Sequence, residues 1–133
     1  VRAMRVALQS AGVEPEEVGH INAHGVGMQT VDTAEAAAIL DVFGDEWGRK
    51  IPVTAPKSFL GNSGAGSGTL ELAASLVALK HGAIPATLNY DRPDPSCPLN
   101  VVTREPRGTS NKLVLNINVT RMAQASAALV EAA

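Results

Sequence analysis

The chain is poor in several residue types whose abundance marks particular classes of protein. Its 133 residues include one cysteine, Cys97, so an internal disulfide is excluded and a reducing cytoplasm is the expected compartment. Lysine and arginine form no cluster and the net charge is -2, which gives no basic surface for nucleic acid. No apolar run approaches the length of a membrane span, and residues 1–10 have the pattern of a helix rather than a signal peptide. We therefore expect a cytoplasmic protein that binds neither nucleic acid nor a membrane.

Aromatic residues are also scarce. They make up 3% of the chain, so the core has to be built from alanine, valine, leucine and isoleucine. Hydrophobic residues amount to 45% and charged residues to 18%, as is usual for a soluble globular protein. At this length we expect one domain, or one lobe of a larger one, that is large enough to bury a core.

Three stretches of the chain have apolar residues at helical spacing. Gly12 follows the first stretch as a C-terminal cap, and the residues from Asp32 to Glu35 have the spacing of a capping box before the second. The three apolar stripes, each expected to face the core, are Val1, Met4, Leu8 and Ala11; Ala36, Ile39, Leu40 and Phe43; and Leu70, Ala73, Ala74 and Val77.

Four short runs have the character of strands. They cover residues 18–24, 51–55, 112–119 and 126–132, and an irregular proline-rich segment precedes the third. The alternation predicts an α/β layered domain with a mixed, mostly parallel sheet flanked by helices. Ligands of such sheets bind beyond the C-terminal ends of the strands, where the polar residues 22–28, 56–64 and 118–124 should converge.

Each residue that stands out in these polar stretches has an ordinary structural explanation when it is taken alone. A lone histidine such as His24 is usually a hydrogen-bonded residue at a strand end, but with glycines beside it an imidazole can also donate to a carbonyl oxygen. Lys57 alone is more often a solvated charge, and Asn62 alone is a common turn residue. We interpret His20, His81 and Cys97 as structural. The glycosylation sequon at Asn118 has no meaning without secretion.

Taken together, the motifs and their order are specific. Residues 21–35, "INAHGVGMQTVDTAE", contain a His-Gly-x-Gly loop with Asp and Glu downstream, and residues 57–61 form a Lys-Ser-x-x-Gly loop. Residues 84–89 read Ile-Pro-x-Thr-Leu-Asn, and Pro-Asp-Pro follows. The chain resembles the C-terminal half of a beta-ketoacyl-acyl carrier protein synthase of the thiolase superfamily. This resemblance implies that residues 1–133 form one of two pseudo-symmetric lobes, without the start of their own half and without the N-terminal half that bears the nucleophile.

The resemblance also implies a reaction. In that family a cysteine takes up an acyl group, and two histidines and a lysine promote decarboxylation of a malonyl thioester and formation of a carbon–carbon bond. The first histidine corresponds to His24 and the lysine to Lys57, whereas Asn62 stands in place of the second histidine, as in related Cys-His-Asn enzymes. Gly61 and Thr120 fall at substrate-binding positions. No metal and no cofactor are implied; the implied partners are acyl carrier protein, acyl and malonyl thioesters, and a second subunit of a homo- or heterodimer.

Two loops depart from the family pattern. The loop that usually reads His-Gly-Thr-Gly-Thr has Val26 and Met28 in place of its hydroxyl residues. The loop Asn-Ser-Phe-Gly-Phe-Gly-Gly corresponds to residues 116–122, "NINVTRM", so every glycine is replaced and Arg121 brings a charge toward the acyl site. The resemblance therefore leaves three functions open. They are a condensing enzyme of fatty acid or polyketide synthesis whose isolated residues 1–133 are inactive, a non-catalytic partner similar to a chain-length factor, and a free-standing binding module.

Overall fold

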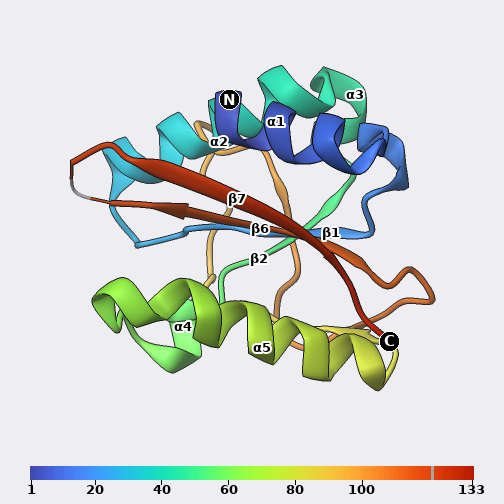
Figure 1. Cartoon of the computed structure of the whole chain (residues 1–133). Coiled ribbons are helices and arrows are strands. Elements are labelled where there is room, and N and C mark those ends of the chain that lie inside the picture. Colours follow the sequence, from blue (N-terminus) through green and yellow to red (C-terminus); the bar gives the residue numbers. More distant parts are fainter. Residues whose placement is uncertain (121) are drawn as a thin grey trace.

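A computed structural model describes residues 1–120 and 122–133, which form three layers (Figure 1). The central layer is a sheet, and helices pack against both of its faces. One face carries α1 (Arg2–Ala11), α2 (Gln29–Phe43) and α3 (Asp45–Gly48), together with the short 3-10 turn Pro15–Glu17. The other face carries α4 (Lys57–Leu60), the 3-10 turn Gly64–Gly66 and α5 (Ser67–Lys80).

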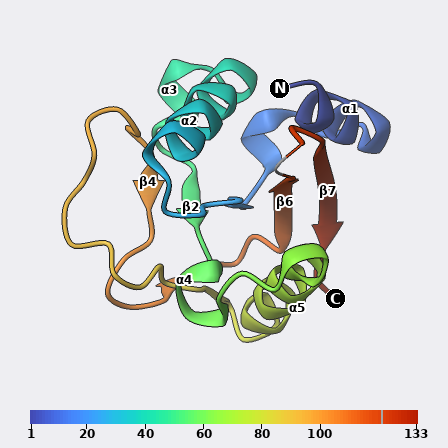
Figure 2. The same ribbon diagram turned by 90° about the vertical axis from the view of Figure 1, so that its left-hand side faces the viewer.

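The main sheet has five strands, and four of them are parallel. Their order is β4-β2-β1-β6-β7, and only β7 runs antiparallel to its neighbour β6 (Figure 2). The strands are β1 (His20–Asn22), β2 (Pro52–Thr54), β4 (Asn100–Val101), β6 (Leu113–Val119) and β7 (Ala125–Glu131), while β3 (Ala83–Ile84) and β5 (Arg107–Gly108) form a separate antiparallel pair. The predicted α/β fold with a mostly parallel sheet is confirmed.

The face of the sheet toward α1 and α2 is the apolar core. Alternate strand residues point to this side, and among them Ile21 of β1 and Leu115 of β6 are completely buried. Ile39 and Phe43 of α2 pack on them, as the spacing predicted, and Gly12 ends α1 in the left-handed conformation at φ 64°. These contacts pack α2 against the middle of the sheet.

The opposite face of the sheet is polar, although α5 buries it. The sequence pattern predicted that the stripe of Leu70, Ala73, Ala74 and Val77 faces the core. This prediction is wrong, because the side chains of Leu70 and Val77 are 49% and 60% exposed. The face of α5 that meets the sheet repeats every four residues and is polar except at its end. The buried polar side chains of this layer are His20, Asn22, Thr54, Asn116, Ser67, Glu71, Ser75 and Lys57.

The capping box predicted at residues 32–35 is also wrong. Helix α2 begins earlier, at Gln29 after the N-cap residue Met28, and no side chain caps it. Asp32 and Glu35 therefore lie inside the first two turns of the helix, where their carboxylates reach back to a different segment of the chain.

Strands β2, β1 and β6 are neighbours and parallel, so the polar stretches that follow them meet at one edge of the sheet, as expected. In the described part of the chain, no helix is both long enough and apolar enough to cross a membrane.

Candidate functional site

The loop that follows β1 is held by two carboxylates. The backbone N–H groups of His24 and Gly25 donate to the Glu35 carboxylate at 2.6 and 2.9 Å. Those of Val26 and Gly27 donate to Asp32 at 3.1 and 3.0 Å. Burial raises the pKa of the Glu35 carboxyl, and the two backbone N–H groups oppose that rise. Two carboxylates of α2 thus fix four successive backbone N–H groups of the loop. This is the role of Asp32 and Glu35, which the sequence pattern had assigned to a helix cap.

The side chain of His24 is half-buried on the same face of the sheet as α5. Its Nδ1 accepts a hydrogen bond from the backbone N–H of Val119, at 3.4 Å, so the neutral ring carries its proton on Nε2. Burial lowers the pKa of His24 and the charge of Lys57 lowers it further, while a hydrogen bond to the Asn118 side chain and the charge of Asp32 act in the opposite direction. The balance favours a neutral imidazole with one N–H to donate.

Lys57 begins α4 shortly after the end of β2, and its ammonium points into the polar layer under α5. Its Nζ lies 2.8 Å from Oε1 and 3.0 Å from Oε2 of Glu71, and the two side chains are only 5% and 1% exposed. Burial raises the pKa of the Glu71 carboxyl, and Lys57 opposes that rise. Sequence reasoning did not select Glu71. The available signal was that Glu71 is the only charged residue between Lys57 and Lys80.

The charge of Lys57 acts on the imidazole of His24, as expected for residues of one site. The side chain of Asn62, in contrast, forms its hydrogen bonds within its own turn. Asn62 is exposed, and its Oδ1 accepts hydrogen bonds from the N–H of Gly64 at 3.0 Å and from the hydroxyl of Ser67 at 3.1 Å. The carboxamide oxygen therefore organises the turn that leads into α5. Gly61 ends α4 at φ 74°, and a Cβ built there would meet no atom within 4 Å, so it is the backbone angle that favours glycine.

Thr120 lies in the turn that joins β6 to β7. Its backbone N–H, the group that the resemblance assigns to substrate oxygen, donates to the carbonyl of Gln124 at 2.8 Å. Its hydroxyl oxygen also accepts from the Gln124 N–H at 3.2 Å. Binding of a substrate oxygen by the Thr120 amide would require this turn to open. The charge expected from Arg121 falls on the one residue that lies outside the described part of the chain.

A cavity of about 550 Å³ opens beside the loop that follows β1. Its wall includes Gly25 and Gly27 from that loop, Lys57 from α4, and Tyr90 and Cys97 from the proline-rich segment. Neither His24 nor Asn62 is among the lining residues. Lys57 thus connects two environments, because it borders this cavity and also acts on the imidazole of His24.

The chemistry available to this arrangement is hydrogen-bond donation beside a positive charge. A neutral imidazole N–H next to a buried ammonium stabilises negative charge that develops on a carbonyl oxygen. Within residues 1–120 and 122–133, no three histidine, cysteine, aspartate or glutamate side chains are grouped so that they could hold a metal ion.

Comparison with known proteins identifies the family. Residues 1–91 match the family described as "Beta-ketoacyl synthase, C-terminal domain". A Streptomyces halstedii protein named polyketide beta-ketoacyl synthase 1 is 37% identical over 116 residues, which are 87% of this chain and 27% of that protein.

Solved structures agree with this match. "The ishigamide ketosynthase/chain length factor" has a TM-score of 0.91 at 36% sequence identity, covering 98% of this chain and 32% of that one. A ketosynthase structure, described as a type II acyl-carrier protein in complex with its ketosynthase bound to the hexaketide, has a TM-score of 0.93 at 28% identity. It covers 99% of this chain and 32% of that chain, so this chain spans about a third of its length. The chain belongs to the beta-ketoacyl synthase family, has the thiolase-like fold of its relatives, and corresponds to that family's C-terminal domain.

Proposed function

We propose that the complete protein is an acyltransferase of the beta-ketoacyl synthase type. A cysteine thiolate from the N-terminal half attacks an acyl thioester, and the carrier thiol leaves. A malonyl thioester then loses carbon dioxide, and the resulting enolate carbon attacks the acyl-cysteine. The new carbon–carbon bond forms as the cysteine thiolate is released. Residues 1–133 contribute the groups that stabilise the enolate.

In this proposal His24 donates its Nε2–H to the malonyl thioester oxygen, and Lys57 supplies positive charge nearby. The observation that carries the proposal is the state of His24, because a backbone donor on Nδ1 fixes the proton on Nε2 and Lys57 favours the neutral ring. Asn62, Gly61 and Thr120 are proposed to complete the substrate site. For that to happen, the turns that now engage Asn62 and Thr120 have to rearrange on binding.

The test is the variant His24→Ala in the complete protein, assayed for decarboxylation of a malonyl thioester. Removal of one preorganised donor typically lowers kcat by about 10²–10³-fold. The matched control is His81→Ala, because His81 is exposed beyond the end of α5 and should have no effect. Unchanged turnover of His24→Ala would eliminate the role proposed for this imidazole.

We also propose that residues 1–133 alone are inactive, because the nucleophile belongs to the other lobe. The exposed apolar residues of α5, among them Leu70 and Val77, support a second lobe that covers this helix. Purified residues 1–133 should neither decarboxylate malonyl thioesters nor condense them, and turnover by this piece would contradict the proposal.

The remaining parts of the proposal concern partners and setting. We propose that the complete protein works in the cytoplasm as a homo- or heterodimer and receives its acyl groups from an acyl carrier protein. The described ketosynthase complex with an acyl-carrier protein supports that partner, and the name of the Streptomyces relative favours polyketide over fatty acid synthesis.

A second candidate is a non-catalytic subunit similar to a chain-length factor. It is favoured by the turn after β6, where the backbone N–H of Thr120 already donates to the carbonyl of Gln124. Trapping with an acyl thioester separates the two functions. A covalent acyl-cysteine in the complete protein supports the enzyme, whereas no adduct together with binding to an active ketosynthase supports the subunit.

A further inference from the structure

Asn116 is a buried polar residue in the middle of β6, and the function proposed above gives it no role. Its carboxamide forms a hydrogen bond at each end. The Oδ1 atom accepts from Nδ2 of Asn22 in β1 at 2.9 Å, and the Nδ2 atom donates to the backbone carbonyl of Gly68 in α5 at 3.2 Å. A single side chain therefore connects two neighbouring strands of the sheet to the helix that covers them.

The first turn of α5 lies close against β6 (Figure 2). Gly68 makes this approach possible, because a Cβ built there would lie 2.7 Å from Nδ2 and 3.0 Å from Cγ of Asn118, two residues after Asn116. The glycine thus brings the backbone of the helix near the strand, and the hydrogen bond from Asn116 holds it there.

The anchored turn carries the partners of two residues of the proposed site. The hydroxyl of Ser67, the residue before Gly68, donates to Oδ1 of Asn62 at 3.1 Å. Further along α5, Glu71 binds the ammonium of Lys57 at 2.8 Å. The positions of Asn62 and Lys57 therefore depend on where the first turn of α5 lies.

The strand end of this network leads to the third residue of the site. Asn22 is the last residue of β1, and His24 follows it by two positions. Asn116 precedes Val119 in β6, and the backbone N–H of Val119 donates to Nδ1 of His24 at 3.4 Å. The two strands that carry and contact the imidazole are thus tied to α5 through one carboxamide.

We propose that Asn116 is a positioning residue, whose carboxamide fixes the placement of His24 relative to Lys57 and Asn62. This inference rests on the proposed function, because that function assigns these three residues to the substrate site. They come from separate segments of the chain, so their alignment has to be set by the contacts between β1, β6 and α5. A network that sets the alignment before substrate arrives lowers the cost of arranging the groups on binding.

The first test is Asn116→Leu in the complete protein, which keeps a similar volume and removes both hydrogen bonds. Amide hydrogen exchange, measured by mass spectrometry, follows the turn without depending on activity. Exchange in residues 61–72 should become faster by about 2–10-fold, the effect of one lost hydrogen bond on a local opening equilibrium. Exchange in α1 should stay the same. Unchanged exchange in residues 61–72 overturns the inference.

A second pair of variants approaches the contact from the helix. Gly68→Ala places a methyl group against Asn118, so the turn should loosen and its exchange should rise as in Asn116→Leu. Gly66→Ala is the matched control, because a Cβ at Gly66 would meet no atom within 4 Å. Equal exchange in the two glycine variants would contradict the role given to Gly68.

The double variant Asn22→Leu with Asn116→Leu separates positioning from stability. It removes both carboxamides together and leaves neither unpaired, so the urea midpoint should return toward that of the parent protein. The kcat for malonyl decarboxylation should stay reduced, by up to about 100-fold, with a smaller change in KM, because the groups of the site are misaligned. A return of kcat together with stability would make the role of Asn116 structural only and overturn the inference. The double variant also keeps the test decisive if Asn116→Leu alone does not fold.

The result for His24→Ala separates this inference from the proposed function. If His24→Ala keeps its turnover while exchange changes as described, the anchoring of α5 by Asn116 stands and the proposed function fails. If His24→Ala loses turnover but Asn116→Leu keeps a normal kcat, the proposed function stands and the inference fails.

Discussion

The ammonium of Lys57 lies between the two carboxylate oxygens of Glu71, 2.8 Å from Oε1 and 3.0 Å from Oε2. Both side chains are almost fully buried, so each charge has lost most of its water and depends on the other. The pair joins α4 to α5 and fixes a positive charge at the edge of the sheet where His24 lies. Stability and the electrostatics of the site are therefore coupled at this contact.

We predict that Glu71→Gln destabilises the protein by about 3–5 kcal/mol, because it leaves a buried ammonium without its counter-charge. The free energy of unfolding from urea titration measures the effect. The double variant Lys57→Met with Glu71→Leu should recover most of that loss, since apolar residues of similar volume replace buried ion pairs at little cost. It should not recover malonyl decarboxylation, because the charge near His24 is gone. Equal stability of the single and double variants would show that the pair is not coupled.

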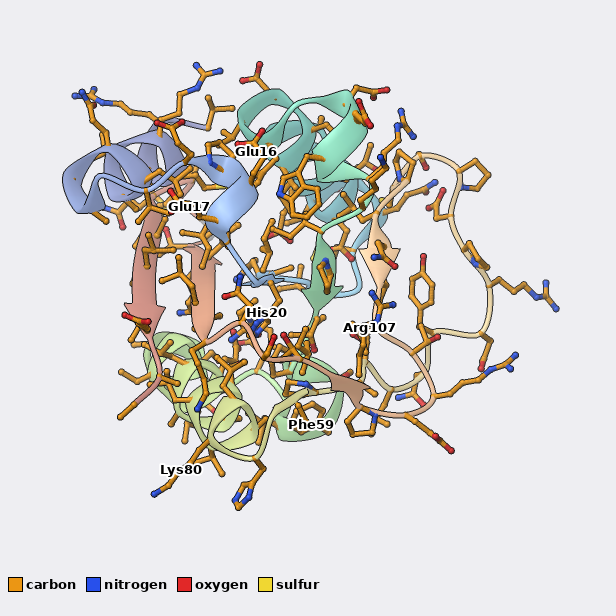
Figure 3. All side chains as sticks on the ribbon, turned by 90° about the vertical axis from the view of Figure 1, so that its right-hand side faces the viewer. Glu16, Glu17, His20, Phe59, Lys80 and Arg107 are labelled. Carbon is orange, nitrogen blue, oxygen red and sulfur yellow. The ribbon has the colours of Figure 1, made fainter. Side chains whose placement is uncertain are left out.

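His20 provides a second prediction, on the acid stability of the fold. Its ring lies in the interior, whereas the labelled side chains of Glu16 and Lys80 lie at the surface (Figure 3). Neither ring nitrogen has a hydrogen-bond partner among the described residues, and burial lowers the pKa of His20 to about 4. The unfolded chain, with an ordinary histidine pKa near 6.5, binds this proton more readily than the folded protein does.

Stability should therefore fall as the pH is lowered from about 6.5 to about 4, by up to about 3 kcal/mol from this residue alone. Above pH 6.5 both states are neutral and the effect vanishes. The check is a set of urea titrations between pH 4 and pH 7 on the protein and on His20→Leu. The variant should show a shallower acid loss, and identical pH dependence of the two proteins would contradict the prediction.

The fold was largely predictable because its apolar patterns are local. The spacing of Ala36, Ile39 and Phe43 indicates one helical face, and the structure buries that face. The pattern failed in α5, where the buried stripe contains Ser67, Glu71 and Ser75 and the apolar residues face outward. A periodicity identifies which residues share a face, but it does not say which face is covered. In α5 the orientation of the helix is decided by the polar side chains of the sheet, which are distant from the helix in the sequence.

The site was less predictable for a related reason. His24 and Lys57 fall at strand ends and could be selected from the motif order. The partners of these residues come from other elements and have no motif of their own: Glu71 lies on α5, and Asn118 matches only a glycosylation sequon. Asp32 and Glu35 were recognised as a pair. Their spacing, however, fits both a helix cap and a pair of carboxylates that accept hydrogen bonds from a preceding loop. Only the position of the first helical residue, Gln29, distinguishes the two.

The loop after β1 supplies a third prediction, on the effect of replacing Gly25 by alanine. A Cβ built on Gly25 would lie 2.6 Å from the Cβ of Ala55, and the residue has φ 41°. Gly27 also has a positive φ, of 75°, but a Cβ there would meet no atom within 4 Å. Gly25→Ala and Gly27→Ala therefore share the backbone strain, of about 1–2 kcal/mol, and differ in the contact with Ala55.

Gly25→Ala should consequently be less stable than Gly27→Ala in thermal or urea unfolding, and it should lower activity more, because the displaced loop carries His24 and releases the two amides held by Glu35. The double variant Gly25→Ala with Ala55→Gly removes the clash and keeps the strain. Its stability should return toward that of Gly27→Ala, after allowance for the single change Ala55→Gly. Failure of this rescue would mean that the close packing of Ala55 against the loop does not position His24, and that the carboxylates of α2 hold the loop by themselves.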